Sequence, residues 1–203
     1  MAKKNKEISS SNLIKVKPIT EGQKSVFETW KQGKNQFLFG CAGTGKTFIS
    51  LYLAMQDVLD LKTKYDKVIL VRSLIPTREI GFLPGDEEDK AALYQVPYQN
   101  MVKFMFEQPN EQAFNMLYDR LKNQGSLYFL STSFLRGLTF DNSIIIVDEC
   151  QNLNFHELDT ITTRVGQDSK IVYCGDFSQT DLLKQNERNG LHDFLRILEE
   201  MQE

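Results

Sequence analysis

Short, unbroken apolar runs alternate along this chain with longer segments in which apolar residues recur every three to four positions. The short runs are typical of strands buried on both faces of a sheet, and the longer segments are typical of amphipathic helices. We expect Pro97 to break or kink the helix that contains it. The predicted strands are residues 36–39, 67–71, 126–130, 143–148 and 170–174, and the predicted helices are residues 21–31, 47–61, 90–108, 111–122, 155–165 and 190–201. This alternation predicts an α/β fold in which helices cover both faces of a mostly parallel sheet.

The first residues of the chain do not share this pattern. They carry a single acid, Glu7, against five lysines: Lys3, Lys4, Lys6, Lys15 and Lys17. We expect residues 1–17 to form a flexible basic arm and residues 18–203 to form one domain. The arm is either a solubilising tail or a local patch that binds nucleic acid.

Composition narrows the function classes only slightly. The chain has 203 residues, a net charge of −3, 41% hydrophobic residues and three cysteines. A charge this small provides no strong global field for nucleic acid, and three cysteines without a C-x-x-C spacing argue against a disulfide framework or a zinc site. With neither a membrane-length apolar run nor a secretion signal, the sequence predicts a cytoplasmic protein that has no membrane partner.

The most informative chemistry lies where the first strand meets the first long helix. Residues 40–47 fill every fixed position of the phosphate-loop pattern G-x-x-x-x-G-K-[ST]. The glycines let backbone N–H groups turn toward an anion, and the dipole of the following helix adds to the attraction. We expect Lys46 to reach the terminal phosphates and Thr47 to ligate Mg²⁺. The predicted nucleotide-binding residues here are Gly40, Cys41, Ala42, Gly43, Thr44, Gly45, Lys46 and Thr47; the alternative is a glycine-rich turn before an ordinary helix.

Polar residues follow two later strands. Asp148 and Glu149 come directly after the apolar run 144–147, and Gln179 ends the segment 175–179, which follows the strand at 170–174. Because the carboxyl ends of parallel strands meet at one edge of a sheet, these groups are expected close to the phosphate loop. We expect Asp148 to bind Mg²⁺, Glu149 to act as the general base toward water, and Gln179 to sense the γ-phosphate. Each segment taken alone is compatible with an ordinary polar turn.

The three motifs together resemble the first RecA-like domain of superfamily 1 helicases. The second motif of those helicases begins Asp-Glu-x-Gln, here residues 148–151, and the third is Gly-Asp-x-x-Gln, here residues 175–179. More closely, the chain resembles the PhoH family of P-loop ATPases over about residues 18–198. The segments that carry this resemblance are 71–73, 81–86, 136–140, 148–152, 163–166 and 175–182. Two positions depart from the family pattern: Cys150 replaces the usual alanine, and Leu138 replaces a second basic residue.

The resemblance implies a RecA-like P-loop NTPase that binds ATP and Mg²⁺ and hydrolyses ATP. It also implies nucleic-acid remodelling or helicase-like activity on single-stranded RNA or DNA, with RNA favoured, and an adenine contact from Gln23. Short versions of this domain are frequent in phage genomes, which would place such a protein in the host cytoplasm. Two alternatives stay open: a non-enzymatic ATP-dependent switch or binding module, and a nucleotide kinase.

Superfamily 1 helicases take a catalytic arginine from a second RecA-like domain, whereas this sequence continues only about twenty residues past its third motif. We therefore expect efficient hydrolysis to use an arginine from a neighbouring subunit of a homo-oligomeric ring, for example a hexamer. Arg136 and Arg164 are favoured because they lie in family-like segments, although for any single arginine a surface ion pair is the better interpretation. The other candidates are Arg72, Arg78 and Arg188, and Thr77 and Arg78 are candidates for contacts with nucleic-acid phosphates.

Overall fold

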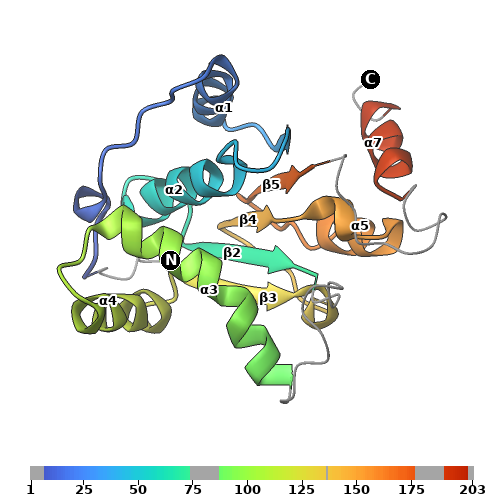
Figure 1. The fold of residues 1–203 in the computed structure, drawn as a ribbon. Helices are drawn as coiled ribbons and strands as arrows, with labels where there is room; N and C mark the ends of the chain where they lie inside the picture. The colour runs from blue at the N-terminus through green and yellow to red at the C-terminus, as the bar shows by residue number, and fades with distance from the viewer. Residues whose placement is uncertain (1–6, 74–86, 136, 177–189, 201–203) are drawn as a thin grey trace.

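The central sheet is parallel, as the sequence predicts. The computed structural model describes residues 7–73, 87–135, 137–176 and 190–200. Within these residues the sheet has the strand order β1-β5-β4-β2-β3, and every neighbouring pair runs parallel (Figure 1). The predicted α/β fold class, with a parallel sheet, is therefore confirmed. The strands are β1 (Gln36–Phe39), β2 (Lys67–Arg72), β3 (Leu127–Ser131), β4 (Ser143–Val147) and β5 (Lys170–Gly175).

Helices cover both faces of the sheet (Figure 1). On one face Ile144 and Ile146 of β4 belong to the same core as α1 (Glu21–Lys31), α2 (Lys46–Leu59), α3 (Glu87–Phe106) and α4 (Glu111–Asn123). On the other face Ile145 and Val147 belong to a core shared with α5 (Phe155–Thr162) and α7 (Gly190–Glu200). Alternate side chains of a strand point to opposite faces, so a strand covered on both faces is apolar throughout.

The strand register brings the carboxyl ends of four strands to one edge. Phe39 at the end of β1 pairs with Gly175 at the end of β5, and Val147 at the end of β4 pairs with both Val71 and Tyr173. The residues that follow these strands therefore meet at the same edge of the sheet, which is where ligands bind in open α/β sheets. They include the phosphate loop after β1 and the Asp-Glu pair after β4.

Residues 7–17 differ from the expected flexible arm. Ile8 and Leu13 are buried in the core, and Ile14 donates its backbone N–H to the carbonyl of Met105 on α3. The hydroxyl of Tyr52 on α2 donates to the Ile14 carbonyl and accepts from the Val16 backbone N–H. The prediction of a flexible arm rested on the lysines. The apolar residues between them, however, attach this segment to the helices that cover one face of the sheet. The first six residues lie outside the described part of the chain.

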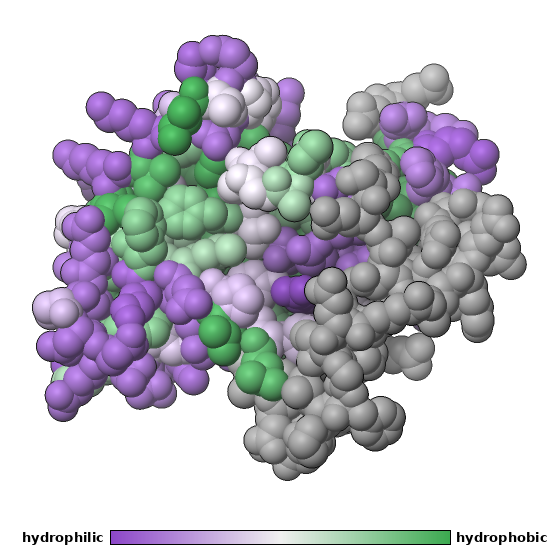
Figure 2. Space-filling view, in the orientation of Figure 1, coloured by the Kyte–Doolittle hydropathy of each residue, from purple (hydrophilic) through white to green (hydrophobic). Residues whose placement is uncertain are grey.

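Helix α3 contains Pro97 and continues past it, so of the expected break or kink the break is not observed. Part of its surface is apolar and exposed: Leu93, Val96 and Phe104 are 53%, 43% and 62% exposed. Figure 2 shows green, hydrophobic surface along the course of this helix. This exposed side of α3 is called the α3 stripe below.

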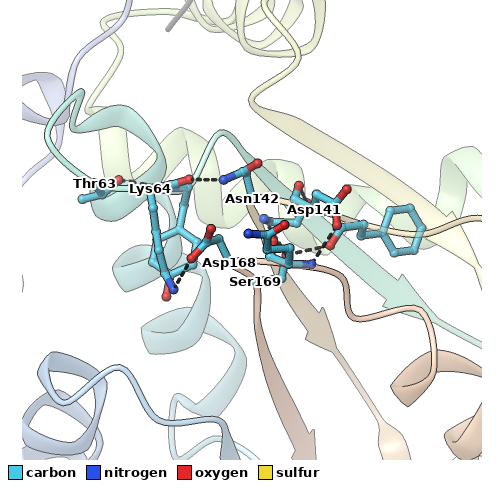
Figure 3. Close-up of polar contacts among 10 residues, drawn as sticks. Thr63, Lys64, Asp141, Asn142, Asp168 and Ser169 are labelled. Atoms are coloured by element: carbon cyan, nitrogen blue, oxygen red, sulfur yellow. Dashed lines mark hydrogen bonds and ion pairs between the residues drawn. The ribbon is translucent and has the colours of Figure 1, made fainter. Parts of the chain in front are cut away.

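The opposite edge of the sheet is held by hydrogen bonds among the loops that lead into the strands (Figure 3). Asn142 donates from Nδ2 to the Lys64 carbonyl at 3.1 Å, and Lys64 Nζ lies 3.1 Å from Asp168 Oδ1. Asp141 accepts from the Gln167 backbone N–H at 2.7 Å, while Ser169 donates to the Phe140 carbonyl. The predicted helix 155–165 ends at Thr162, and Val165 instead forms a β-bridge with Phe140.

Gly166 occupies the tightest point of this edge. A Cβ atom at this position would collide with the Asp141 carboxylate and lie 2.9 Å from the Phe140 carbonyl oxygen. We expect Gly166→Ala to lower the free energy of unfolding by about 1–3 kcal/mol, the usual cost of forcing extra volume into packed structure. Urea denaturation followed by circular dichroism measures this change.

Gly22→Ala is the matched control. Gly22 lies in α1, and the nearest atom to its added Cβ would be Thr20 Oγ1 at 4.0 Å. Alanine is the better helix former, so this variant should be neutral or more stable by up to about 1 kcal/mol. A Gly166→Ala variant as stable as Gly22→Ala would contradict the packing described for this edge.

Candidate functional site

The phosphate loop has the strand–loop–helix context that its motif requires. It follows β1, and α2 begins at Lys46 with Gly45 as its N-cap. Gly43 and Gly45 have φ values of 78° and 84°, a left-handed conformation that other residues rarely adopt. No atom lies within 4 Å of the place where a Cβ of Gly43 would be. The loop therefore has an open inner surface, as a cradle for an anion needs.

Lys46 folds back over this loop. Its ammonium donates to the carbonyl oxygens of Gly40 at 2.6 Å and Cys41 at 2.9 Å. The Thr44 hydroxyl donates to the same Cys41 carbonyl and so tightens the curve. A cation held against neutral carbonyls can exchange them for phosphate oxygens, which are stronger acceptors.

Thr47 and Asp148 offer two oxygen atoms suited to Mg²⁺. The Thr47 hydroxyl donates to Asp148 Oδ1 at 2.7 Å, although the two residues are 101 positions apart in sequence. Mg²⁺ prefers oxygen ligands and usually keeps several waters and substrate phosphates, so one hydroxyl and one carboxylate are a fitting protein contribution. Among the described residues no group of three or more His, Cys, Asp or Glu side chains forms a denser metal site.

The second carboxylate oxygen of Asp148 is held by a tyrosine. Tyr98 of α3, only 2% exposed, donates from its hydroxyl to Asp148 Oδ2 at 2.7 Å. Burial and the Asp148 charge raise the pKa of Tyr98 well above its ordinary value. Burial would lower the pKa of Arg72, but the neighbouring Tyr98 and the nearby charges of Asp148 and Glu149 raise it instead. A phenol, a guanidinium and a carboxylate thus form one network at this edge.

Glu149 has an unusual backbone. Its φ and ψ are 52° and 42°, a left-handed conformation that costs a non-glycine residue on the order of 1–3 kcal/mol. Its Oε2 accepts from the side-chain amide of Gln151 at 2.5 Å. Gln151 in turn accepts from the Asp176 backbone N–H at 3.1 Å, and Asp176 Oδ2 accepts from the Ala42 backbone N–H at 3.0 Å. This chain of bonds connects the acid after β4 to the phosphate loop.

These groups surround one pocket with a volume of about 200 Å³. Its lining comes from the phosphate loop, α2, α3 and the ends of β4 and β5. Its lining includes Gly43, Lys46, Thr47, Asp148, Glu149 and Asp176, together with Phe48 and Met101. The pocket combines loop amides, one lysine and two neighbouring carboxylates, which is a set suited to a phosphate ester and a divalent cation.

The three cysteines lie at or near this edge but differ in exposure. Cys41 is exposed in the phosphate loop, whereas Cys150 and Cys174 are buried. Burial, reinforced by nearby Asp148, raises the pKa of both buried thiols. They are therefore poor nucleophiles, and Cys41 is the cysteine that an oxidant can reach.

The structure brings some of the predicted site residues together, whereas others lie outside the residues that it describes. The structure brings the phosphate loop, Asp148 and Glu149 together. Gln23 lies against the loop, where its Nε2 donates to the Thr44 carbonyl at 3.1 Å, but its Oε1 already accepts the Ile19 backbone N–H at 2.7 Å. Its contact with adenine stays a prediction. Gln179 lies outside the described residues, as do Thr77, Arg78, Arg136 and Arg188.

The two described arginine candidates have different surroundings. Arg72 lies beside the Asp-Glu pair, while Arg164 donates weakly to the carbonyls of Thr160 and Leu138, each at 3.4 Å. Sequence reasoning did not identify Tyr98, nor the bonds made by Gln151 and Asp176. Gln151 and Asp176 lie within the second and third motifs, residues 148–151 and 175–179, so the sequence did contain a signal for these two residues. Nothing near Tyr98 in the sequence points to a partner 50 positions away.

Comparison with known proteins agrees with the sequence resemblance. A family model described as PhoH-like protein matches residues 15–203. A PhoH-like protein of Bacillus subtilis is 31% identical over 189 residues, which cover 93% of this chain and 54% of that protein. Protein PhoH of Escherichia coli is 32% identical over 166 residues, covering 81% of this chain and 44% of that protein. Protein PhoH2 of Bacillus subtilis is 36% identical over 145 residues, covering 71% of this chain and 32% of that protein.

A solved structure, the crystal structure of Pif1 helicase from Candida albicans, aligns with 86% of this chain and 37% of that chain, at 21% identity and a TM-score of 0.38. The chain spans between a third and about half of the curated relatives named above. The match of the family model to nearly the whole chain, together with the assembled phosphate loop and Asp-Glu pair, shows that this chain belongs to the PhoH family.

Proposed function

We propose that this chain is a magnesium-dependent ATPase. The observation that carries the proposal is the contact of Thr47 with Asp148, beside Lys46 and Glu149 in one pocket. A hydroxyl and a carboxylate for the metal, a lysine for the phosphates and a second carboxylate for water are the parts that phosphoryl transfer to water requires.

Each residue has a distinct role in this proposal. The loop N–H groups and Lys46 hold the phosphates of ATP, and Thr47 and Asp148 hold Mg²⁺, which neutralises charge on the phosphate oxygens. Glu149 accepts a proton from the attacking water through a carboxylate oxygen, with Gln151 fixing the orientation of its side chain. Gln179 senses the γ-phosphate, and Gln23 contacts adenine.

A phosphate-release assay with ATP in Mg²⁺ and in EDTA tests this proposal. We expect steady release that depends on magnesium. ATP binding without release would favour the alternative of a non-enzymatic switch or binding module. Phosphorylated nucleoside products would favour the nucleotide kinase, which the second carboxylate of the Asp-Glu pair disfavours because it suits water attack.

We further propose that hydrolysis drives remodelling of single-stranded nucleic acid, RNA more than DNA. Support comes from the family membership and from the helicase-like motifs, with the segment after β2 as the expected contact. Oligo(U) and oligo(dT) should bind with an affinity that falls as salt rises, and should stimulate phosphate release.

Among the described residues, no helix has both the length and the hydropathy that crossing a bilayer demands.

The proposed assembly is a homo-oligomeric ring in which a neighbouring subunit supplies an arginine. The α3 stripe supports this, because exposed apolar side chains beside a pocket suit burial against another subunit. Phe104 of the stripe packs edge-on against Phe48, which lines the pocket. The molecular mass in solution, measured with and without a non-hydrolysable ATP analogue, tests the assembly.

A further inference from the structure

The hydroxyl of Tyr98 reaches Asp148 from outside the recognised motifs. This tyrosine comes from α3, it is almost fully buried, and its hydroxyl donates to Asp148 Oδ2 at 2.7 Å. On the other carboxylate oxygen, the Thr47 hydroxyl donates to Oδ1 at 2.7 Å. The backbone N–H of Asp148 donates to the Val71 carbonyl at 2.9 Å. Both oxygens and the backbone of this residue are therefore fixed in direction.

The surroundings of Tyr98 also restrict it. Arg72, the last residue of β2, lies close to Tyr98, and its guanidinium lies 5.5 Å from the centre of the Tyr94 ring. The ring of Tyr98 packs against Phe129 of β3, with 5.7 Å between ring centres. The packing of its ring and its own hydrogen bond therefore hold the phenol where it donates to Asp148.

We propose that Tyr98 is a positioning residue for the Mg²⁺-binding carboxylate. By occupying Oδ2, its hydroxyl prevents Asp148 from rotating and leaves Oδ1, beside the Thr47 hydroxyl, as the oxygen that would hold the metal. Hydrogen bonds that orient a metal ligand commonly change metal affinity by about 10- to 100-fold. This inference rests on the proposed function, since it concerns the metal that accompanies ATP.

Tyr98→Phe tests the role, because it removes the hydroxyl and keeps the ring that packs against Phe129. The measurement is the affinity of a fluorescent ATP analogue in EDTA and across a Mg²⁺ titration. We expect Tyr98→Phe to need about 10- to 100-fold more Mg²⁺ for half of the magnesium-dependent gain in affinity, with little change in EDTA. Electron paramagnetic resonance of Mn²⁺ with ADP should show weakened metal binding in the same variant.

Tyr52→Phe is the matched control. Tyr52 is also a buried tyrosine with a hydrogen-bonded hydroxyl, but its partners are the Ile14 carbonyl, the Val16 N–H and Gln56. We expect it to keep the wild-type Mg²⁺ dependence even where it lowers stability in urea. Folded Tyr98→Phe with wild-type Mg²⁺ dependence, or an equal loss in Tyr52→Phe, would overturn the inference alone. Wild-type protein without magnesium-dependent binding would overturn the proposed function and this inference together.

Discussion

Glu149→Gln is expected to slow ATP hydrolysis by about 10²- to 10⁴-fold, which is the usual contribution of a general base. The substitution keeps the length of the side chain and an oxygen that can accept from Gln151, but it removes the basic carboxylate. Affinity for ATP should change by less than about threefold, because the proposed role of this residue concerns water and not the phosphates. Phosphate release and binding of a fluorescent ATP analogue, measured on the same preparation, separate the two effects.

Glu199→Gln is a suitable control, because it makes the same change of charge at an exposed position on α7. It should leave turnover at the wild-type value. If Glu149→Gln turned over ATP as fast as Glu199→Gln, Glu149 would not be the base. If it lost binding and turnover equally, the residue would act in holding the nucleotide instead.

The second large effect is expected from Asp148→Asn. Asn has the same shape, and its oxygen can still accept from Tyr98 or Thr47, but the charge that attracts Mg²⁺ is gone. We expect the Mg²⁺ concentration needed for tight ATP binding to rise at least about 100-fold, since a direct ligand should matter no less than the groups that orient it. Turnover should fall by at least about 100-fold, because charge neutralisation at the phosphates contributes several kcal/mol.

The result in EDTA decides how the Asp148→Asn outcome is understood. Without metal, the variant should bind ATP as well as the wild type or slightly better, because one negative charge near the phosphates has been removed. A loss of affinity in EDTA would mean that the substitution disturbs the phosphate loop itself. Wild-type Mg²⁺ dependence in this variant would contradict the assignment of Asp148 as a metal ligand.

Most of the fold could be predicted because its signals are local. The run Ser143–Val147 is buried throughout. Polar and apolar residues do not alternate in it because helices cover both faces of the sheet. Thr20 accepts from the Gln23 backbone N–H as the N-cap of α1, and the predicted helix 21–31 has the observed bounds. The main error arises where tertiary contacts outweigh local preference: Ile8 and Leu13 attach a lysine-rich segment to the core.

The same distinction applies to the candidate site, where contiguous motifs could be predicted from the sequence and long-range contacts could not. The phosphate loop and the Asp-Glu pair are contiguous strings, and the parallel register that joins them follows from the strand pattern. The network of Tyr98 with Asp148 and Arg72 depends on how α3 crosses the sheet, and no spacing in the sequence encodes that crossing. The left-handed backbone of Glu149 was equally unpredictable, because non-glycine residues rarely adopt it.

The central claim is that a triphosphate binds at the carboxyl edge of the sheet through the charge of Lys46. Calorimetric titration of ATP in Mg²⁺ into the wild type, Lys46→Ala and Lys64→Ala tests it most directly. Lys64 is a control with the same loss of charge at the opposite edge, where it pairs with Asp168. We predict that Lys46→Ala weakens ATP binding at least about tenfold, the value of a charge-assisted hydrogen bond, while Lys64→Ala binds like the wild type. Wild-type protein that binds no ATP, or equal affinities in all three proteins, would contradict the account.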